Sequence, residues 1–200
     1  MGNALRTALD GLDKDLKQAA ELRVRIGDAK LRKFQDDLVF ELAFLRSVIA
    51  WETFLEESFF LFATGRPSLS GVPPRRLVTP KYRADAEAMV LGGRSFVSWT
   101  SADTLIRSKL WFDAGGPFVP LGSDSRLDEL QTVRNRIAHG IGNAQTKFTK
   151  LCEVRHPNSN VRRGMGPGRF LSHPAAKRAT DTRFERYQGV LLSTATAICQ

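Results

Sequence analysis

Residues 31–67, LRKFQDDLVFELAFLRSVIAWETFLEESFFLFATGRP, carry a long and regular helical pattern. Apolar side chains recur there every three or four residues, which places them on one face of an α-helix. Gly65 and Pro67 then end the pattern. The segment therefore predicts a helix of about ten turns. Its expected buried positions are Leu31, Phe34, Leu38, Leu42, Leu45, Ile49, Leu55, Phe59 and Phe62.

Shorter helical patterns lie on both sides of this segment. One precedes it, with apolar residues at Leu5, Leu9, Leu12, Leu16 and Ala19 and a break at Gly27. Four more follow: a short one at about 83–91, one that Ser101 caps and 115–117 ends, one from Ser123 or Ser125 to Gly140 and Gly142, and a last one from Phe184 to Ile198.

Two stretches lack this period. Residues 65–80 contain four prolines and two glycines and predict a surface loop. Residues 154–178 have five Arg, one Lys and no acid, with many Gly, Pro, Ser and Asn, and predict a basic loop or flap. No stretch alternates enough to require a sheet. We expect a single all-α domain over residues 1–200: an antiparallel helical bundle with a long second helix, a basic irregular insertion and a C-terminal helix.

Composition narrows the classes of function. Lys plus Arg is 30 and Asp plus Glu is 21, which gives a net charge of +9 and favours polyanionic partners. Two cysteines cannot form a disulfide framework, so we expect a reducing, cytoplasmic location. The N-terminus lacks the apolar core of a signal peptide. The most apolar stretch, residues 42–63, carries four charges, so no membrane role is expected.

Two charged residues break the apolar pattern of their helices. Glu52 lies seven residues from both Leu45 and Phe59, and Arg134 lies seven residues after Leu127. Seven residues is nearly two helical turns, so both charges project from an apolar face. Because buried charges are costly unless paired, Glu52 and Arg134 are candidates to face one another. Alternatively, each lies at the edge of its face and reaches solvent.

The sequence RNRIAHG at 134–140 is the best candidate for chemistry. The sequence has no zinc-binding HExxH, no Cys-x-x-Cys and no Walker A loop, and Cys152 and His156 lack a second ligand pair, so no metal or cofactor is expected. His139 could transfer a proton near neutral pH. Arg134 could stabilise charge on a phosphorus atom, and Asn135 adds a neutral donor and acceptor.

Helix geometry constrains this pair. Five residues along an ideal helix rotate by about 140° and rise by about 7.5 Å. Arg134 and His139 therefore converge on one phosphate only if the helix ends or bends near His139, which Gly140 permits, or if two copies of the motif meet across a twofold axis. In the simplest alternative, a histidine before a glycine only caps the helix.

RNRIAHG resembles the R-x4-6-H signature of HEPN domains, with Arg134 and His139 as the pair and Asn135 as the polar residue after the arginine. SVIAWETFLEESF at 47–59, SFVSW to PF at 95–118, and LDELQTVRNRIAHG at 127–140 are similar to the RiboL-PSP type of this superfamily. The likeness covers roughly residues 30–142.

The resemblance implies a homodimeric helical bundle in which two motifs line one composite site. It implies a metal-independent endoribonuclease whose products end in a 2′,3′-cyclic phosphate and a 5′-hydroxyl. It implies a toxin or anti-phage effector with RNA as substrate and an antitoxin or operon partner. Arg134, His139 and Asn135 are then the catalytic group, and Glu52 supports Arg134. The alternatives are a non-catalytic HEPN module that binds RNA or a protein, and a dimerisation domain.

The basic segment suits contact with RNA phosphates. Phe170 could stack on a base, whereas Trp51 and Trp99 are assigned to the core or to an interface. The alternative is a solvated basic loop without a ligand. The candidate RNA-binding residues are Arg136, Arg155, Arg162, Arg163, Arg169, Lys177 and Arg178.

Overall fold

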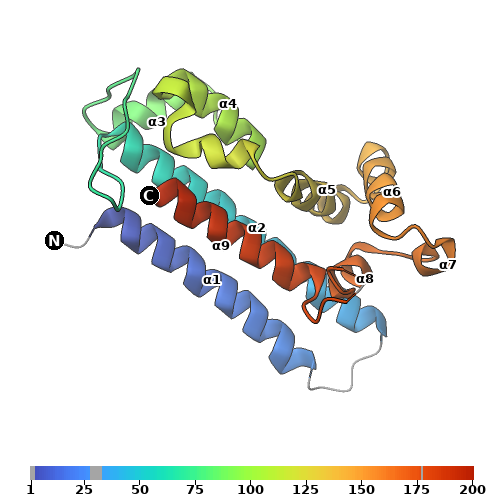
Figure 1. Cartoon of the computed structure of the whole chain (residues 1–200). Helices are drawn as coiled ribbons and strands as arrows, with labels where there is room; N and C mark the ends of the chain where they lie inside the picture. Colours follow the sequence, from blue (N-terminus) through green and yellow to red (C-terminus); the bar gives the residue numbers. More distant parts are fainter. Residues whose placement is uncertain (1–2, 28–32, 177) are drawn as a thin grey trace. The chain divides into compact units, whose positions relative to one another are not determined.

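The computed structural model describes residues 3–27, 33–176 and 178–200 (Figure 1). These residues form helices and loops, with two isolated β-bridges and no strand among them, so the all-α prediction is confirmed. The helices are α1 (Ala4–Gly27), α2 (Lys33–Ala63), α3 (Arg83–Leu91), α4 (Ser101–Trp111), the 3-10 helix η1 (Asp113–Gly122), α5 (Arg126–His139), α6 (Asn143–Arg155), α7 (Ser159–Arg162), α8 (Pro167–Ser172) and α9 (Arg183–Cys199).

The chain divides into two compact units. The first contains residues 1–14, 49–124 and 191–200, and the second contains residues 15–48 and 125–190. Helices α1, α2 and α9 each contribute residues to both units. The candidate motif and the basic segment both belong to the second unit.

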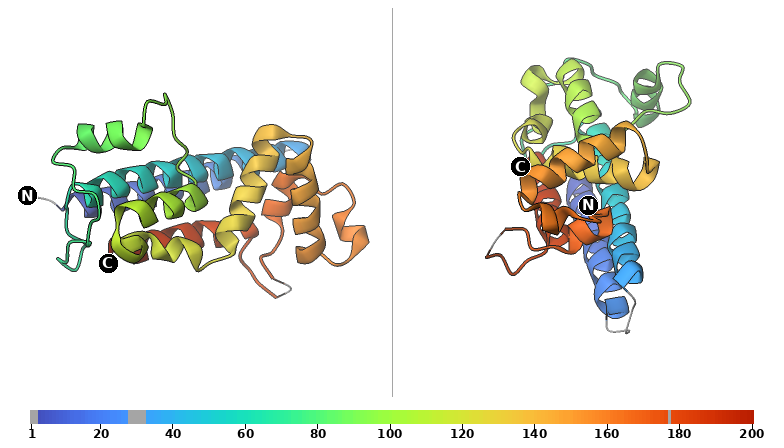
Figure 2. Two further views of the ribbon diagram at one scale, coloured as in Figure 1. Left: turned by 90° about the horizontal axis from the view of Figure 1, so that it is seen from above. Right: turned by 90° about the vertical axis from the view of Figure 1, so that its right-hand side faces the viewer.

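Aromatic side chains form the core of the first unit. Phe59, on α2, is fully buried. Five rings lie with their centroids 5.3–5.8 Å from it, those of Phe60, Trp99, Trp111, Phe112 and Phe118. Trp51 and Trp99 are both buried, which confirms their assignment to the core. Helix α4 leads into η1, which turns back beside it (Figure 2).

In the second unit, α9 packs against α2 and α1. Phe184 meets Phe40 edge to face with ring centroids 6.0 Å apart. One turn further along α9, Gln188 donates to the Leu16 carbonyl at 2.9 Å and to the Ser47 hydroxyl at 3.2 Å. Ser47 is buried, so these bonds satisfy polar groups that would otherwise be costly.

The predicted buried face of the long helix is wrong over its first half. Phe34, Leu38, Leu42 and Ile49 are 50–64% exposed. The adjacent face is buried instead, and it carries Val39, Phe40, Ala43, Phe44 and Val48. Both faces are apolar, so the period alone does not distinguish them; the buried face is the one whose Phe40 and Phe44 pack against Phe184 and Tyr187 of α9. From Leu55 onward the predicted positions are buried.

Residues 154–178 are not an irregular loop throughout, so the prediction of a basic loop or flap is wrong for part of this segment. The segment contains the last residues of α6 and the whole of α7 and α8. Helix α8 approaches α2 so closely that a Cβ on Gly168 would lie 2.0 Å from the Asp37 carbonyl oxygen. The Gly168 amide donates to the Glu41 carboxylate at 3.0 Å. Gly168 is therefore required for the packing of α8 on α2.

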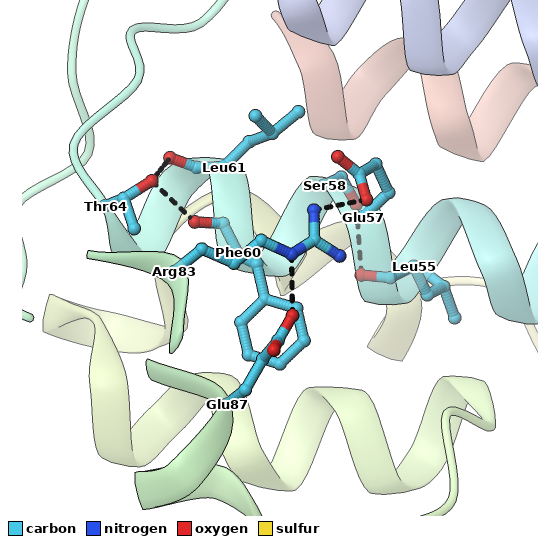
Figure 3. Close-up of polar contacts among 8 residues, drawn as sticks. All are labelled: Leu55, Glu57, Ser58, Phe60, Leu61, Thr64, Arg83 and Glu87. Atoms are coloured by element: carbon cyan, nitrogen blue, oxygen red, sulfur yellow. Dashed lines mark hydrogen bonds and ion pairs between the residues drawn. The ribbon is translucent and has the colours of Figure 1, made fainter. Parts of the chain in front are cut away.

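Residues 65–80 form a loop with no helix or strand, as predicted. Backbone contacts hold it in place in the first unit: Leu69 donates to the Cys199 carbonyl, and the Ser70 hydroxyl donates to the Gln200 carbonyl, both at 2.7 Å. At the end of α2, the Thr64 hydroxyl donates to the Phe60 carbonyl at 2.8 Å (Figure 3). No described helix has the length and apolarity needed to span a membrane.

Candidate functional site

Helix α5 presents the candidate motif, and local sequence sets both of its ends. It starts after Ser125, as predicted, with Asp128 and Glu129 in its first turn. Acidic side chains there interact favourably with the positive end of the helix dipole. Leu127, Leu130 and Val133 are buried and anchor the helix.

The helix ends at His139, as convergence of the motif requires. Gly140 follows with a φ of 70°, a left-handed conformation that suits glycine. Its amide donates to the Arg136 carbonyl at 3.1 Å, and the Ile141 amide donates to the His139 carbonyl at 2.8 Å. Helix α6 then begins at Asn143, so the turn holds the start of α6 next to the end of α5.

A pocket of about 310 Å³ lies where these two helices meet. His139 is exposed at its edge, and Asn135, one helical turn earlier, shares the same face. Helix α6 contributes Lys147 to the lining of the same pocket. The lining residues are Thr132, Asn135, His139, Ile141, Asn143, Ala144 and Lys147.

Arg134 does not line this pocket but contacts a residue that does. Its Nη1 donates to the Asn135 side-chain oxygen at 3.4 Å, and Gln131 Nε2 donates to the same oxygen at 3.1 Å. With that oxygen accepting twice, the Asn135 amide nitrogen is the group left to donate into the pocket. The structure thus places His139 and Asn135 together and Arg134 beside Asn135.

The sequence did not indicate Lys147 as a site residue, because the helix that carries it, α6, was not predicted. Helix α6 buries only Phe148 and Cys152, and two apolar residues are too few to establish a helical period. The one available signal was a lysine close behind the motif. Arg136, a candidate for RNA contact, donates to the Gly140 carbonyl and so also caps the end of α5.

Glu52 and Arg134 lie in different units, so their pairing stays a prediction. Glu52 is half-buried on α2, and Arg134 is half-buried on α5. Neither charge is fully buried, which agrees with positions at the edge of an apolar face.

The candidate RNA-binding arginines of the basic segment differ in whether they bond to a carboxylate or to backbone carbonyls. Arg155 donates to the Glu129 carboxylate through Nε at 3.1 Å and through Nη2, so its charge is already paired and its pKa is raised by that carboxylate. Arg162 donates to the carbonyls of His156 and Pro157 at 3.0 and 2.8 Å. Arg169 donates to the Arg163 carbonyl at 3.1 Å.

Arg163 and Arg178 are exposed. Lys177 lies outside the described residues. Phe170 is fully buried, so the expectation that it stacks on a base is wrong. It packs instead against the ring of Phe148, with centroids 5.5 Å apart. A helical turn that points this residue inward was not foreseen in a segment predicted as a loop.

Comparisons of the chain with models of protein families, with curated proteins and with solved structures find no match. Among the described residues, no three His, Cys, Asp or Glu side chains cluster closely enough to hold a metal ion. The chemistry proposed below therefore rests on the pocket at the end of α5 and on the resemblance of its motif.

Proposed function

We propose that this chain is a metal-independent endoribonuclease whose reacting pocket lies at the end of α5. The observation that carries the proposal is the grouping of His139, Asn135 and Lys147 around one open pocket. Imidazole is the side chain best suited to proton transfer near neutral pH. An amide and an ammonium group provide donors for a phosphate. The HEPN-like motif and the net charge of +9 agree with an RNA substrate.

In the proposed reaction, the 2′-hydroxyl of RNA attacks the adjacent phosphorus. His139 takes the proton from the 2′-oxygen as the new P–O bond forms. Lys147 and the Asn135 amide group stabilise the extra negative charge on the non-bridging oxygens. The P–O5′ bond breaks, and the leaving oxygen takes a proton from water or from His139 of a second copy. The products are a 2′,3′-cyclic phosphate and a 5′-hydroxyl.

Arg134 has an indirect position in this scheme. Through its bond to the Asn135 oxygen, it fixes the orientation of the amide nitrogen. In a homodimer, two motifs would also share one composite site, as the family resemblance implies. Mixing Arg134→Ala with His139→Ala subunits tests this arrangement, because only a composite site regains activity in the mixed dimer.

The test is incubation of purified protein with total RNA in EDTA, beside the His139→Ala variant, followed by sequencing of new 5′-hydroxyl ends. We expect discrete ends from the wild type and a loss of at least about a hundredfold in the variant. Because His139 is exposed, the variant should keep the fold, which circular dichroism checks. Equal cleavage by both proteins, or a strict need for a divalent ion, contradicts the proposal.

The resemblance extends the proposal to a toxin or anti-phage effector held in check by an antitoxin or operon partner. Expression of the wild type should then arrest growth, and expression of His139→Ala should not. Growth arrest by both proteins would separate toxicity from RNA cleavage.

The alternative function is a non-catalytic module that binds RNA or a protein. The observation that favours it is the place of Arg134 outside the pocket that His139 lines. This alternative predicts that RNA binding survives in the His139→Ala variant and that neither protein makes new RNA ends.

A further inference from the structure

Arg183, the first residue of α9, is a buried cation that forms no hydrogen bond to a carboxylate; Glu129 acts on it only through its charge. It is 7% exposed, and its Nε has no hydrogen-bond partner. Its Nη2 contacts the Arg155 carbonyl at 3.4 Å and His156 Nε2 at 3.3 Å. Among the described residues, it forms no ion pair. Buried charges in proteins are normally paired directly, so this guanidinium, with its Nε unbonded, can accommodate a further anion.

Arg83 provides the contrast within the same chain. This less buried arginine donates to the carboxylates of Glu57 and Glu87, each at 2.6 Å (Figure 3). These carboxylates raise the pKa of Arg83, whereas burial lowers the pKa of Arg183. The chain thus gives the exposed Arg83 two carboxylates in direct contact, whereas the buried Arg183 has only the charge of Glu129, without a hydrogen bond to it.

A pocket of about 560 Å³ opens beside Arg183. That volume lies within the range typical of small-molecule sites, about 300–1,000 Å³. His156 and His173 both line it, with their ring centroids 5.0 Å apart and the ring planes at 72°. The rest of the wall is largely apolar and includes Pro157, Val161, Pro174 and Ala176.

The contact with Arg183 fixes which nitrogen of His156 carries the proton. A guanidinium has no acceptor, so His156 Nε2 must accept from Arg183 Nη2 at 3.3 Å. The proton of the neutral ring then lies on Nδ1. His156 therefore keeps one N–H donor that Arg183 does not use.

Donors on three separate residues suit a tetrahedral oxyanion better than a planar carboxylate. The two ring planes are at 72° and Arg183 belongs to α9, so the three groups do not share one plane. A divalent cation does not fit, because Arg183 would repel it. The apolar wall suits an uncharged body attached to the anion.

We propose that Arg183, His156 and His173 form a binding site for a phosphate monoester group, carried by a nucleotide-sized molecule or by the end of an RNA chain. The site shares no lining residue with the pocket of His139. It goes beyond the proposed function and does not depend on RNA cleavage.

Histidine NMR signals test the proposal directly, with inorganic phosphate as the probe. Before phosphate is added, burial, Arg183 and His173 lower the pKa of His156 from 6.5 to about 4. Arg162 adds positive charge nearby, whereas the charge of Arg155 is paired with Glu129, which also acts on Arg183. A bound phosphate favours the charged ring, so it should raise the pKa of His156 by about one or more. Unchanged His156 and His173 titrations at saturating phosphate would overturn the proposal.

Variants then locate the phosphate. Arg183→Gln and His173→Gln should each weaken binding by about ten- to a hundredfold, the effect of losing a charge-assisted hydrogen bond. The half-buried His173 keeps the test valid if Arg183→Gln does not fold. Arg186→Gln is the matched control, because Arg186 is exposed on the same helix and does not line this pocket. Equal weakening by all three changes would indicate an adventitious ion only.

Two further probes identify the source of the phosphate. Adenosine monophosphate should bind more tightly than inorganic phosphate if the ligand is a small molecule, because its base can contact the apolar wall. A 5′-phosphorylated oligoribonucleotide should bind more tightly than its 5′-hydroxyl form if the ligand is an RNA end. Absence of both preferences would overturn a monoester site.

Discussion

The two histidine regions of the second unit differ in how the chain builds them. His139, Asn135 and Arg134 lie on one helical turn, and only Lys147 comes from another helix. In contrast, His156 follows α6, His173 follows α8 and Arg183 begins α9. The motif of the first region spans only seven consecutive residues, 134–140. The second spans 28 positions, so it exists only after three helices have packed.

The difference also separates the two regions by chemistry. His139 is exposed and lines one pocket with Asn135 and Lys147. His156 is half-buried, and its pKa is lowered to about 4, so its ring is neutral near pH 7. Its Nε2 lone pair already accepts from Arg183, so the ring has an N–H to donate but no free nitrogen with which to take a proton from a substrate. The two proposals accordingly place proton transfer in the first region and anion binding in the second.

Removing the aromatic floor of the second region should have the largest effect. Phe170 is fully buried, and the Arg183 guanidinium carbon lies 4.7 Å from the centre of its ring. Phe170→Ala should lower the free energy of unfolding by about 3–5 kcal/mol, because it leaves a cavity and removes the cation–π contact. Urea titration measures this loss.

Phe34→Ala makes the same chemical change at a side chain that is 64% exposed. It should alter stability by less than about 0.5 kcal/mol. If Phe170→Ala and Phe34→Ala lose similar stability, the side chain of Phe170 is not part of a packed core beneath the second region.

Lys147→Ala should have the next largest effect, on activity rather than stability. Loss of one donor to the developing phosphate charge costs about a hundredfold in rate. Lys150→Ala is the matched control, because Lys150 is exposed on the same helix outside the pocket. Initial rates on a defined RNA measure both. If Lys147→Ala leaves the rate unchanged, Lys147 does not stabilise the phosphate charge and is not part of the reacting site.

The contrast explains what the sequence could predict. Helices α1, α3, α5 and α9 were predicted close to their observed bounds, because each carries a clear apolar period or a strong end signal. The cap of α4 is Thr100 rather than Ser101, and its hydroxyl accepts from the Asp103 amide at 3.2 Å. The motif and the helix end at His139 were also visible, since both are local.

What failed depends on contacts between distant residues. The exposed face of α2, with Phe34 and Leu38, is as apolar as the buried one, and only packing chooses between them. Helix α6 has too few buried residues for a period. The pocket of His156 gave one signal: two of the three histidines lie in the basic segment. Their presence in one segment does not predict that the rings of His156 and His173 lie side by side.

Gly168→Ala should destabilise the second region by about 1–3 kcal/mol, because α8 must move away from the Asp37 backbone to admit a Cβ. Gly189→Ala is a control of opposite sign, because nothing lies within 4 Å of that position on α9. Alanine there should stabilise the helix by roughly 0.5–1 kcal/mol. Thermal unfolding compares the two. A neutral Gly168→Ala would mean that the contact between α8 and α2 is loose.

The smallest expected effect is the pH dependence of stability that His156 imposes. Its folded pKa is about 4 and its ordinary value is 6.5, so between these values the unfolded chain binds a proton that the folded chain does not. The free energy of unfolding should therefore rise with pH across this window and fall on acidification, by about 1 kcal/mol after allowance for solvent screening. His156→Gln should remove this slope.

Asn158→Ala alters the same pocket without removing a titratable group. Because its side chain caps α7, this variant should lose the same stability at pH 4.5 and at pH 7. Urea titrations of the three proteins at the two pH values measure the difference. If His156→Gln keeps the slope of the wild type, the neutral ring beside Arg183 does not exist in solution, and the distinction between a reacting and a binding histidine is lost.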